Sequence, residues 1–159
     1  MNSSIFLEGD LRNNFLFFQL LSESYHRLIG QPLTPPTMAG RQSMRWLYED
    51  APFAILAHNT APDPVFIYGN IAAQKQFEYD WEELTSLPSR LSAEAPEREV
   101  RHRFLQQVTR DNFVTGYSGI RIAKSGKRFR IENATVWQLI DSTGIVHGQA
   151  ARLPLTVYL

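Results

Sequence analysis

The strongest constraint on this chain is the alternation of apolar and polar residues over 128–140. Counting every second residue places large apolar groups on one side of a strand, at Phe129, Ile131, Trp137 and Leu139. The other side carries Arg128, Arg130, Glu132 and Gln138. A strand with one apolar side packs on a core through that face only, which is typical of antiparallel sheets.

Turn residues on both sides of this strand predict two hairpins. Gly126 lies in a turn at 124–127, and Gly144 lies in a turn at 141–144. We therefore expect three long strands, at 117–123, 128–140 and 145–153, with a continuation of the last one past Pro154.

The middle of the chain predicts shorter elements. Apolar runs at 53–57 and 65–68 flank a turn rich in Pro and Asn, which indicates another hairpin. Asn70 is a suitable N-cap for a helix at 71–77, and Asp80 begins a capping box for a further short helix. Pro96 fits the first position of a longer helix at 96–110.

The helix at 96–110 has an apolar side and a basic side. We place Val100, Phe104 and Val108 on its buried face. The remaining side carries three arginines, Arg98, Arg101 and Arg103. We interpret them as a solvated face balanced by nearby glutamates rather than as a nucleic-acid patch.

The start of the chain forms a helical extension. Periodicity predicts a helix at 12–29, Gly30 and Pro32 end it, and 31–40 is a linker. A second helix at 41–50 then leads into the strands. We divide the chain into an extension and linker at 1–40 and a main domain at 41–159.

The first helix has more large apolar residues than one stripe can hold. Phe15 and Phe18 point away from the stripe that contains Phe17 and Leu21. Leaving them exposed is unfavourable. We therefore expect a homodimer in which the 12–29 helix and the outer sheet face take part. The alternative is that the helix folds over its own sheet and buries both sides.

Charge and cysteine content exclude several classes of function. The 159 residues contain 16 Lys plus Arg and 16 Asp plus Glu, so there is no basic surplus for nucleic acid. The chain has no cysteine, which excludes disulfides, thiolate metal sites and thiol nucleophiles. No signal peptide opens it, and no run approaches the ~20 apolar residues of a membrane span. We expect a cytoplasmic protein that binds neither nucleic acid nor membranes.

The predicted order of elements resembles the PAS fold. Segments 66–73 and 77–84 resemble two steps of that fold, the first with an aromatic residue and an Asn before small residues. The resemblance implies an α+β domain with a five-stranded antiparallel sheet and short helices across one face. Here an N-terminal helical extension precedes it.

A more specific similarity is to the MEKHLA family, a PAS-related group with bacterial single-domain members. The matching stretches, in order, are 47–54, 81–94, 117–119, 126–132 and 147–151. The string that gave the family its name is absent. The homeodomain and zipper of the plant members are also absent, so no DNA-binding role carries over. The resemblance implies a sensory or regulatory role and no established ligand.

We place a candidate ligand site between the apolar side of the long strands and the helices of 71–110. Asn133 and Thr135 fall on that side by period-two counting, and buried polar groups without partners cost about 1–3 kcal/mol each. They would orient a ligand; the alternative is bonding to backbone or water. The predicted ligand-binding residues are Tyr68, Phe77, Trp81, Ile122, Phe129, Ile131, Asn133, Thr135, Trp137 and Gln149.

The sequence does not identify a cofactor. Flavin-binding LOV domains place a Gln of the last strand beside the flavin ring, and Gln149 is similar. This chain lacks the cysteine that forms the flavin adduct in LOV domains, so a flavin–thiol adduct is excluded. Non-covalent flavin binding is kept as an alternative. Haem is disfavoured because His102 lies between two arginines on the expected exposed face. Arg90 is interpreted as a salt-bridge residue, with an anion clamp as the alternative.

These observations predict a non-catalytic, PAS-like sensory or regulatory module. It would bind a small ligand and act through contacts with a second copy of the chain and with an unidentified regulatory protein. The alternative is an association module with a filled core and no ligand. The four histidines show no metal-ligand spacing, so neither a metal site nor an enzyme is predicted.

Overall fold

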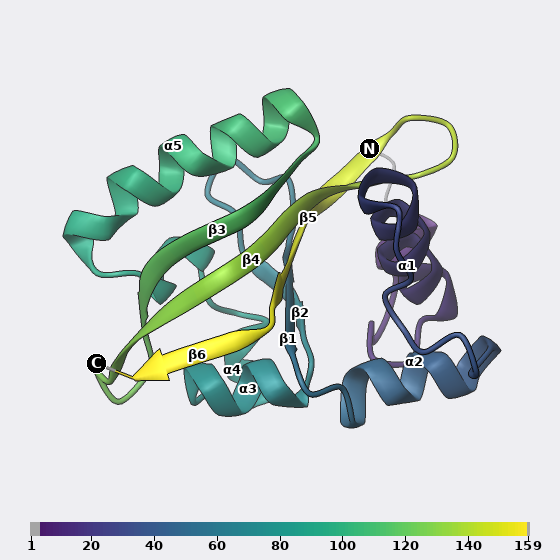
Figure 1. The fold of residues 1–159 in the computed structure, drawn as a ribbon, viewed down its shortest axis with the longest axis horizontal. Coiled ribbons are helices and arrows are strands. Elements are labelled where there is room, and N and C mark those ends of the chain that lie inside the picture. Colours follow the sequence, from purple (N-terminus) through teal and green to yellow (C-terminus); the bar gives the residue numbers. More distant parts are fainter. Residues whose placement is uncertain (1–3, 159) are drawn as a thin grey trace.

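The computed structural model describes residues 4–158 as a curved antiparallel sheet with helices on both sides (Figure 1). In chain order the elements are η1 (Ile5–Leu7), α1 (Phe15–Ile29), α2 (Gly40–Glu49), β1 (Ala54–His58), β2 (Phe66–Gly69), α3 (Ile71–Phe77), α4 (Trp81–Leu84), η2 (Ser89–Ser92), α5 (Ala95–Asp111), β3 (Phe113–Ile122), β4 (Arg128–Ile140), β5 (Val146–Leu153) and β6 (Leu155–Tyr158).

The sheet confirms the predicted five-stranded antiparallel arrangement. The strand order is β2-β1-β5-β4-β3, and β6 also pairs with β4. β5 pairs with the second half of β4, from Thr135 to Ile140, whereas β6 pairs with the first half, from Phe129 to Glu132. Pro154 separates the two strands, so β6 continues along the same edge of β4 from the point where β5 ends. This is the continuation past Pro154 that the sequence predicts.

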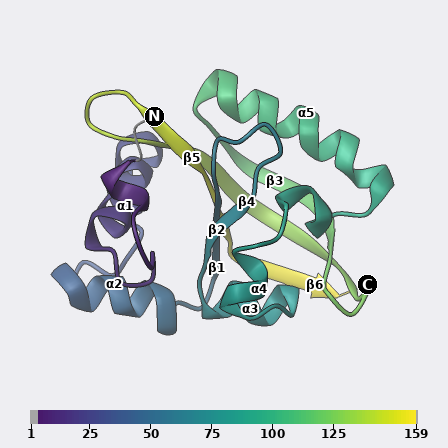
Figure 2. The ribbon, with the colours of Figure 1, turned by 180° about the vertical axis from the view of Figure 1, so that it is seen from behind.

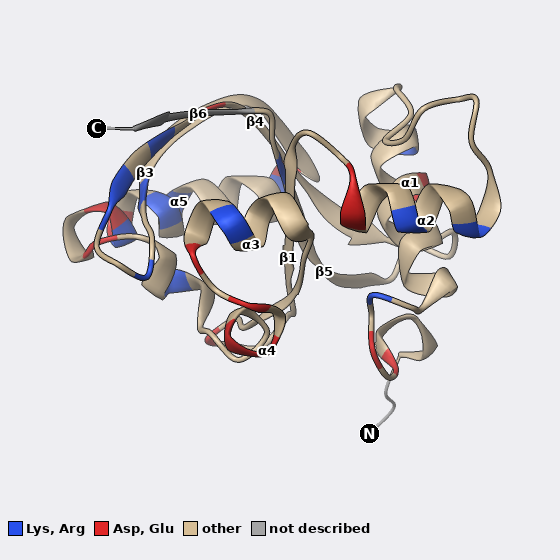
Figure 3. Cartoon of the chain, turned by 90° about the horizontal axis from the view of Figure 1, so that it is seen from below, with Lys and Arg blue, Asp and Glu red and all other residues tan. Residues whose placement is uncertain are grey.

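Helices cover the sheet from two sides. The helices α3, α4 and α5 occupy the concave side, while α1 and α2 lie beyond β1 and β5 on the other side (Figure 2). We call these the inner and outer faces. Basic residues lie on α2, α3, α5 and β3, and acidic ones gather around α4, so the described surface carries both signs (Figure 3). Within residues 4–158 no helix is long and apolar enough to cross a membrane.

Local helix signals act as the sequence predicts. The Asn70 side chain caps α3 by accepting from the Ala73 N–H at 3.0 Å. Asp80 and Glu83 form the predicted capping box of α4. Asn70 does more than cap, because its amide nitrogen also donates to the carbonyls of Leu47 and Phe53 at 3.0 Å. It therefore ties the end of α2 to the first strand.

The register of β4 differs from strict alternation because the strand contains a bulge. Asn133 has φ +53, and β4 gains one residue relative to β3 between the pairs Gly119–Ile131 and Tyr117–Ala134. One extra residue moves every later side chain to the opposite face. The prediction that Asn133 and Thr135 face the inner side is therefore wrong: Asn133 is exposed, and Thr135 shares the outer face with Trp137.

The aromatic stretch of α1 is buried within the chain. Phe17, Phe18 and Leu21 pack into one core with Trp137 and Leu139 of β4. Leu11, Leu33 and the buried residues of α1 therefore share a core with the sheet. This matches the alternative in which the helix folds over its own sheet, and it removes the burial argument for a homodimer. The homodimer and the division at residue 40 stay predictions.

Candidate ligand site beneath the long helix

The inner face contains a small cavity between α5 and the sheet. Its volume is about 60 Å³. The lining residues are Leu56, Ala57, His58, Phe66, Phe77, Ser92, Arg101, Phe104, Leu105, Tyr117, Arg121, Ile131, Val136, Gln149, Ala150, Ala151 and Leu153. Most of them are apolar, none is acidic, and two are arginines.

The helix α5 brings Arg101 to this cavity. Arg101 shares a helical stripe with Phe104, Leu105 and Val108, at spacings of three, four and seven residues. Its exposed fraction is 9%, whereas Val100 is 47% exposed. The expectation that Arg101 is solvated and Val100 buried is therefore wrong. Arg103 is exposed as expected.

Neither cavity arginine has a carboxylate partner within residues 4–158. Arg121 donates to the Ile120 carbonyl at 2.9 Å and to the Tyr117 hydroxyl at 3.1 Å. Arg101 has no hydrogen-bond or ion-pair partner among the described residues, and its side chain borders an open cleft as well as the cavity. Burial, together with repulsion from the Arg121 cation, lowers the pKa of Arg101 to about 10. Arg101 nevertheless stays charged at neutral pH.

His58 at the end of β1 also lines the cavity. Its Nδ1 lies 2.9 Å from the Asn59 carbonyl oxygen, and its Nε2 has no partner among the described residues. A carbonyl only accepts, so Nδ1 carries the hydrogen and Nε2 is an unused acceptor. Burial lowers the pKa of His58 to about 4, and the charge of Arg101 adds to this effect. The ring is therefore neutral at neutral pH.

A closed amide network lies beside His58. The Gln149 amide nitrogen donates to the Thr109 hydroxyl at 3.0 Å and to the Gln138 side-chain oxygen at 3.3 Å. The Gln138 amide nitrogen reaches the Thr109 carbonyl at 3.4 Å. Both hydrogens of the Gln149 amide are thus used within the protein, and the Gln149 side-chain oxygen is the part of that amide that interacts with the His58 ring.

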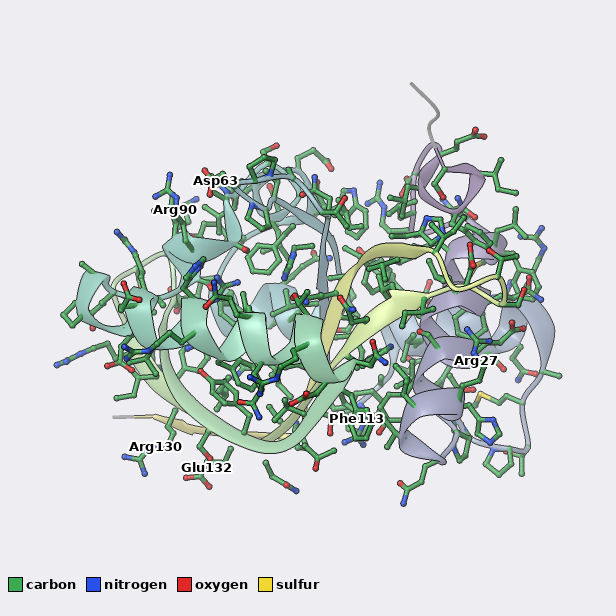
Figure 4. All side chains as sticks on the ribbon, turned by 90° about the horizontal axis from the view of Figure 1, so that it is seen from above. Arg27, Asp63, Arg90, Phe113, Arg130 and Glu132 are labelled. Atoms are coloured by element: carbon green, nitrogen blue, oxygen red, sulfur yellow. The ribbon has the colours of Figure 1, made fainter. Side chains whose placement is uncertain are left out.

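The cavity adjoins an open cleft of about 750 Å³ between the β1–β2 loop and α5. His58, Arg101, Leu105 and Gln149 border both spaces. At the cleft edge Arg90 pairs with Asp63 at 3.1 Å (Figure 4). This is the salt bridge that the sequence favours over an anion clamp. A ligand could enter through the cleft and reach the two buried groups at its base.

The predicted ligand-binding residues separate into two groups. Phe77, Ile131 and Gln149 line the cavity, and Phe129 packs behind Phe77 with ring centres 5.0 Å apart. Most of the others lie elsewhere: Tyr68, Trp81 and Trp137 are in the core of the outer face. Ile122 pairs with Arg128 on the outer side of the sheet. Asn133 and Thr135 lie outside the cavity because of the bulge.

The sequence reasoning missed the charged part of the site. Arg101 carried a usable signal, because its spacing to Phe104, Leu105 and Val108 places it on the apolar stripe. His58 continues the alternation of Ala54 and Leu56 and was likewise within reach. Arg121 faces inward because it pairs with Phe129 across the sheet, which only the strand register reveals.

The sheet order, the helices on the concave face and the cavity beneath α5 define a PAS-like domain. The PAS domain of a protein from Colwellia psychrerythraea superposes with a TM-score of 0.61 at 13% identity, covering 75% of this chain and 95% of that one. A light-oxygen-voltage domain studied with a flavin analogue gives 0.55 at 14% identity, covering 67% and 77%. An RNA-binding light-oxygen-voltage receptor gives 0.62 at 18% identity, covering 80% of this chain and 37% of that one.

The sequence itself gives the family. Residues 16–155 match the MEKHLA domain, so the chain belongs to the MEKHLA domain family. The match includes α1, which is consistent with the shared core of that helix and the sheet. A comparison with curated proteins finds no match to this sequence.

Proposed function

We propose that this domain is a sensory or regulatory module that binds a small ligand in the cavity beneath α5, without catalysing a reaction. The observation that carries the proposal is a pair of buried polar groups at the cavity. His58 has a buried Nε2 without a hydrogen-bond partner, and Arg101 has no carboxylate partner among residues 4–158. Ligand pockets typically combine apolar walls with a few polar groups of this kind. Non-covalent flavin stays a candidate, although the cavity of about 60 Å³ favours something much smaller.

The position of the cavity supports signalling through protein contacts. The helix α5 and strands β3 and β4 are among the elements that line it, and the outer side of β3, β6 and the first half of β4 carries no helix (Figure 1). Ion-paired Arg130 and Glu132 lie on that uncovered side and project from it (Figure 4). A ligand that moves α5 or β3 would therefore alter a surface that is open to a second copy or a regulatory protein.

The proposal is tested by comparing native and denatured masses of the protein after incubation with a small-molecule extract of cells. An excess mass in the native state that is lost on denaturation supports a ligand. A native mass equal to the denatured mass favours the alternative, an association module without a ligand. The cytoplasmic location and the regulatory partner stay predictions.

The homodimer is proposed separately and has its own test. Sedimentation at about 100 μM would reveal an association with a Kd in the micromolar range. A monomer at that concentration contradicts the dimer. The exposed Leu16 on α1 is the side chain to change, because it is 41% exposed while its neighbours Phe17 and Phe18 are buried. Leu16→Lys should weaken a dimer that uses this helix and leave the fold intact.

A further inference from the structure

Two groups among the arginines of this chain contrast in their surroundings. Five arginines form surface ion pairs, namely Arg12, Arg90, Arg110, Arg128 and Arg130. Arg101 and Arg121 are buried, at 9% and 7% exposed, and have no carboxylate within reach among residues 4–158. A buried cation is strongly unfavourable without a compensating charge. The two arginines that most need an anion are therefore the two whose protein surroundings supply none.

Both cations face the same small space. Arg101 comes from α5 and Arg121 from β3, and their charges repel each other across the cavity region. The cavity lining contains no Asp or Glu. An anion placed there would relieve the repulsion and accept the unused guanidinium hydrogens. A carboxylate suits two such donors because each of its oxygens accepts in the plane of the group.

His58 adds a requirement of the opposite kind. Its Nε2 is an acceptor, and the nearby Gln149 amide donates its hydrogens to Thr109 and Gln138 instead. A bare carboxylate cannot donate to Nε2. A ligand with a hydroxyl group next to its acid group satisfies both the two guanidinium donors and the imidazole acceptor.

The cavity also limits the size of the ligand. A water needs roughly 10–15 Å³ of cavity measured in this way, so about 60 Å³ holds roughly four to six non-hydrogen atoms. Phe66, Phe77 and Ile131 form apolar walls. We propose that the cavity binds a small hydroxycarboxylate, whose acid group lies against Arg101 and Arg121 and whose hydroxyl donates to Nε2 of His58. This inference rests on the proposed ligand-binding function and names its ligand class.

The proposal is tested with four small probes at about 20 mM, a concentration that saturates a millimolar site. Chemical-shift titration of the full chain is carried out with lactate, propionate, lactamide and inorganic phosphate. Lactate should bind, and uncharged lactamide should bind about 10- to 100-fold more weakly, because bonds to charged groups are the stronger ones. Propionate lacks the hydroxyl and should bind about 3- to 10-fold more weakly than lactate. Phosphate, which has no apolar part, should bind least.

Variants then assign the two ends of the ligand. Arg101→Met should weaken lactate about 10- to 100-fold, while Arg103→Met on the exposed side of the same helix should leave it unchanged. His58→Leu should bring the affinities for lactate and propionate together. This ratio stays informative if the variant is less stable than the natural protein. In the natural protein the probe ranking alone decides the proposal if a variant fails to fold.

The failures are distinguishable. Equal binding of lactate and lactamide overturns the anion and leaves the proposed function standing. Propionate binding as tightly as lactate overturns the hydroxyl, and a preference for phosphate overturns the carboxylate. If no probe binds while native mass shows another ligand, the hydroxycarboxylate is wrong and the ligand-binding function survives. If no probe binds and no mass excess is found, both fail.

Discussion

The two faces of the sheet differ in whether their buried polar groups have hydrogen-bond partners. On the outer face the fully buried Trp137 packs against Tyr25 with ring centres 4.8 Å apart and donates from Nε1 to the Ser24 hydroxyl at 3.0 Å. On the inner face the buried Arg101 and His58 border a cavity and leave charge and an acceptor unused. The outer face is a filled core, whereas the inner face contains a small cavity bordered by polar groups.

This difference shows how to separate polar groups that hold a fold from those that bind a ligand. Buried polar groups are normally hydrogen-bonded, so each exception needs an explanation. Ser24 and Asn70 are buried and have partners for their side-chain groups. Both side chains therefore have a structural role. Arg101 has no such partner among residues 4–158, and it lies where a ligand can reach it from the cleft.

The largest effect is expected on the outer face. Trp137→Ala removes a side chain that is 0% exposed and leaves a cavity among Tyr25, Leu139 and the residues of α1. Urea denaturation should show a loss of about 3–5 kcal/mol in the free energy of unfolding. Trp46→Ala, at a partly buried tryptophan of α2, is the matched control and should lose less. Equal losses would mean that the outer face is not a tightly packed core.

A second large effect is expected where the outer helices join the sheet. Asn70→Ala removes four hydrogen bonds: two N–H groups lose their acceptor, and the carbonyls of Leu47 and Phe53 lose their donor. Unpaired buried groups should reduce the free energy of unfolding by about 2–4 kcal/mol. Asn14→Ala removes the cap of α1 and the bonds from the Asn14 amide to the carbonyls of residues 5, 6 and 8. These sites are exposed or partly buried, so water replaces the lost bonds and the loss should be about 1–2 kcal/mol. A smaller loss for Asn70 than for Asn14 would contradict its role as a tie between elements.

Much of this fold could be predicted because local signals decide it. The turns at Gly126 and Gly144 fix two hairpins, and Asn70 starts α3 at the residue that the sequence indicates. Period-two counting holds for Phe129 and Ile131 but fails after Asn133, since an Asn tolerates φ +53 and nothing in the sequence marks the extra residue. Trp137 therefore lies on the opposite face from the one predicted.

The candidate site was less accessible to sequence reasoning than the fold. Charge does not indicate exposure at Arg101, because the spacing of Arg101 to Val108 places it on the buried stripe. The pairing of Arg121 with Phe129 depends on strand register, which no local pattern gives. Arg101 and Arg121 are charged but buried. Reasoning that expects charged residues at the surface therefore does not find this site.

The acid sensitivity of the inner face gives a prediction of intermediate size. An unfolded His binds a proton below about pH 6.5, whereas burial lowers the folded pKa of His58 to about 4. Between these values the unfolded state holds more protons, so His58 makes stability fall as pH falls from about 6.5 to about 4. The loss should be about 2–3 kcal/mol at ~1.4 kcal/mol per pH unit.

His58→Leu isolates this contribution. Measured as the difference in unfolding free energy from the natural protein, the variant should gain about 2–3 kcal/mol between pH 7 and pH 4. The exposed His102→Leu is the matched control. A difference between His58→Leu and the natural protein that does not change with pH would show that the His58 ring is accessible to solvent in the folded state. The inner face would then not shield its polar groups.

The smallest effect is expected from Arg101→Met, and the sign of its change in unfolding free energy distinguishes the inner face from the outer face. Removing a buried side chain normally destabilises a protein, as at Trp137. Arg101 is a buried cation without a partner among residues 4–158, so Arg101→Met removes an unfavourable charge and keeps most of the apolar stem. After refolding from denaturant to remove bound ligand, Arg101→Met should unfold at the same free energy as the natural protein or up to about 2 kcal/mol higher. Arg103→Met, exposed two positions along α5, should stay within about 0.5 kcal/mol. A loss of more than about 1 kcal/mol at Arg101 would make that arginine part of the structure, and the inner face would then be a core like the outer one.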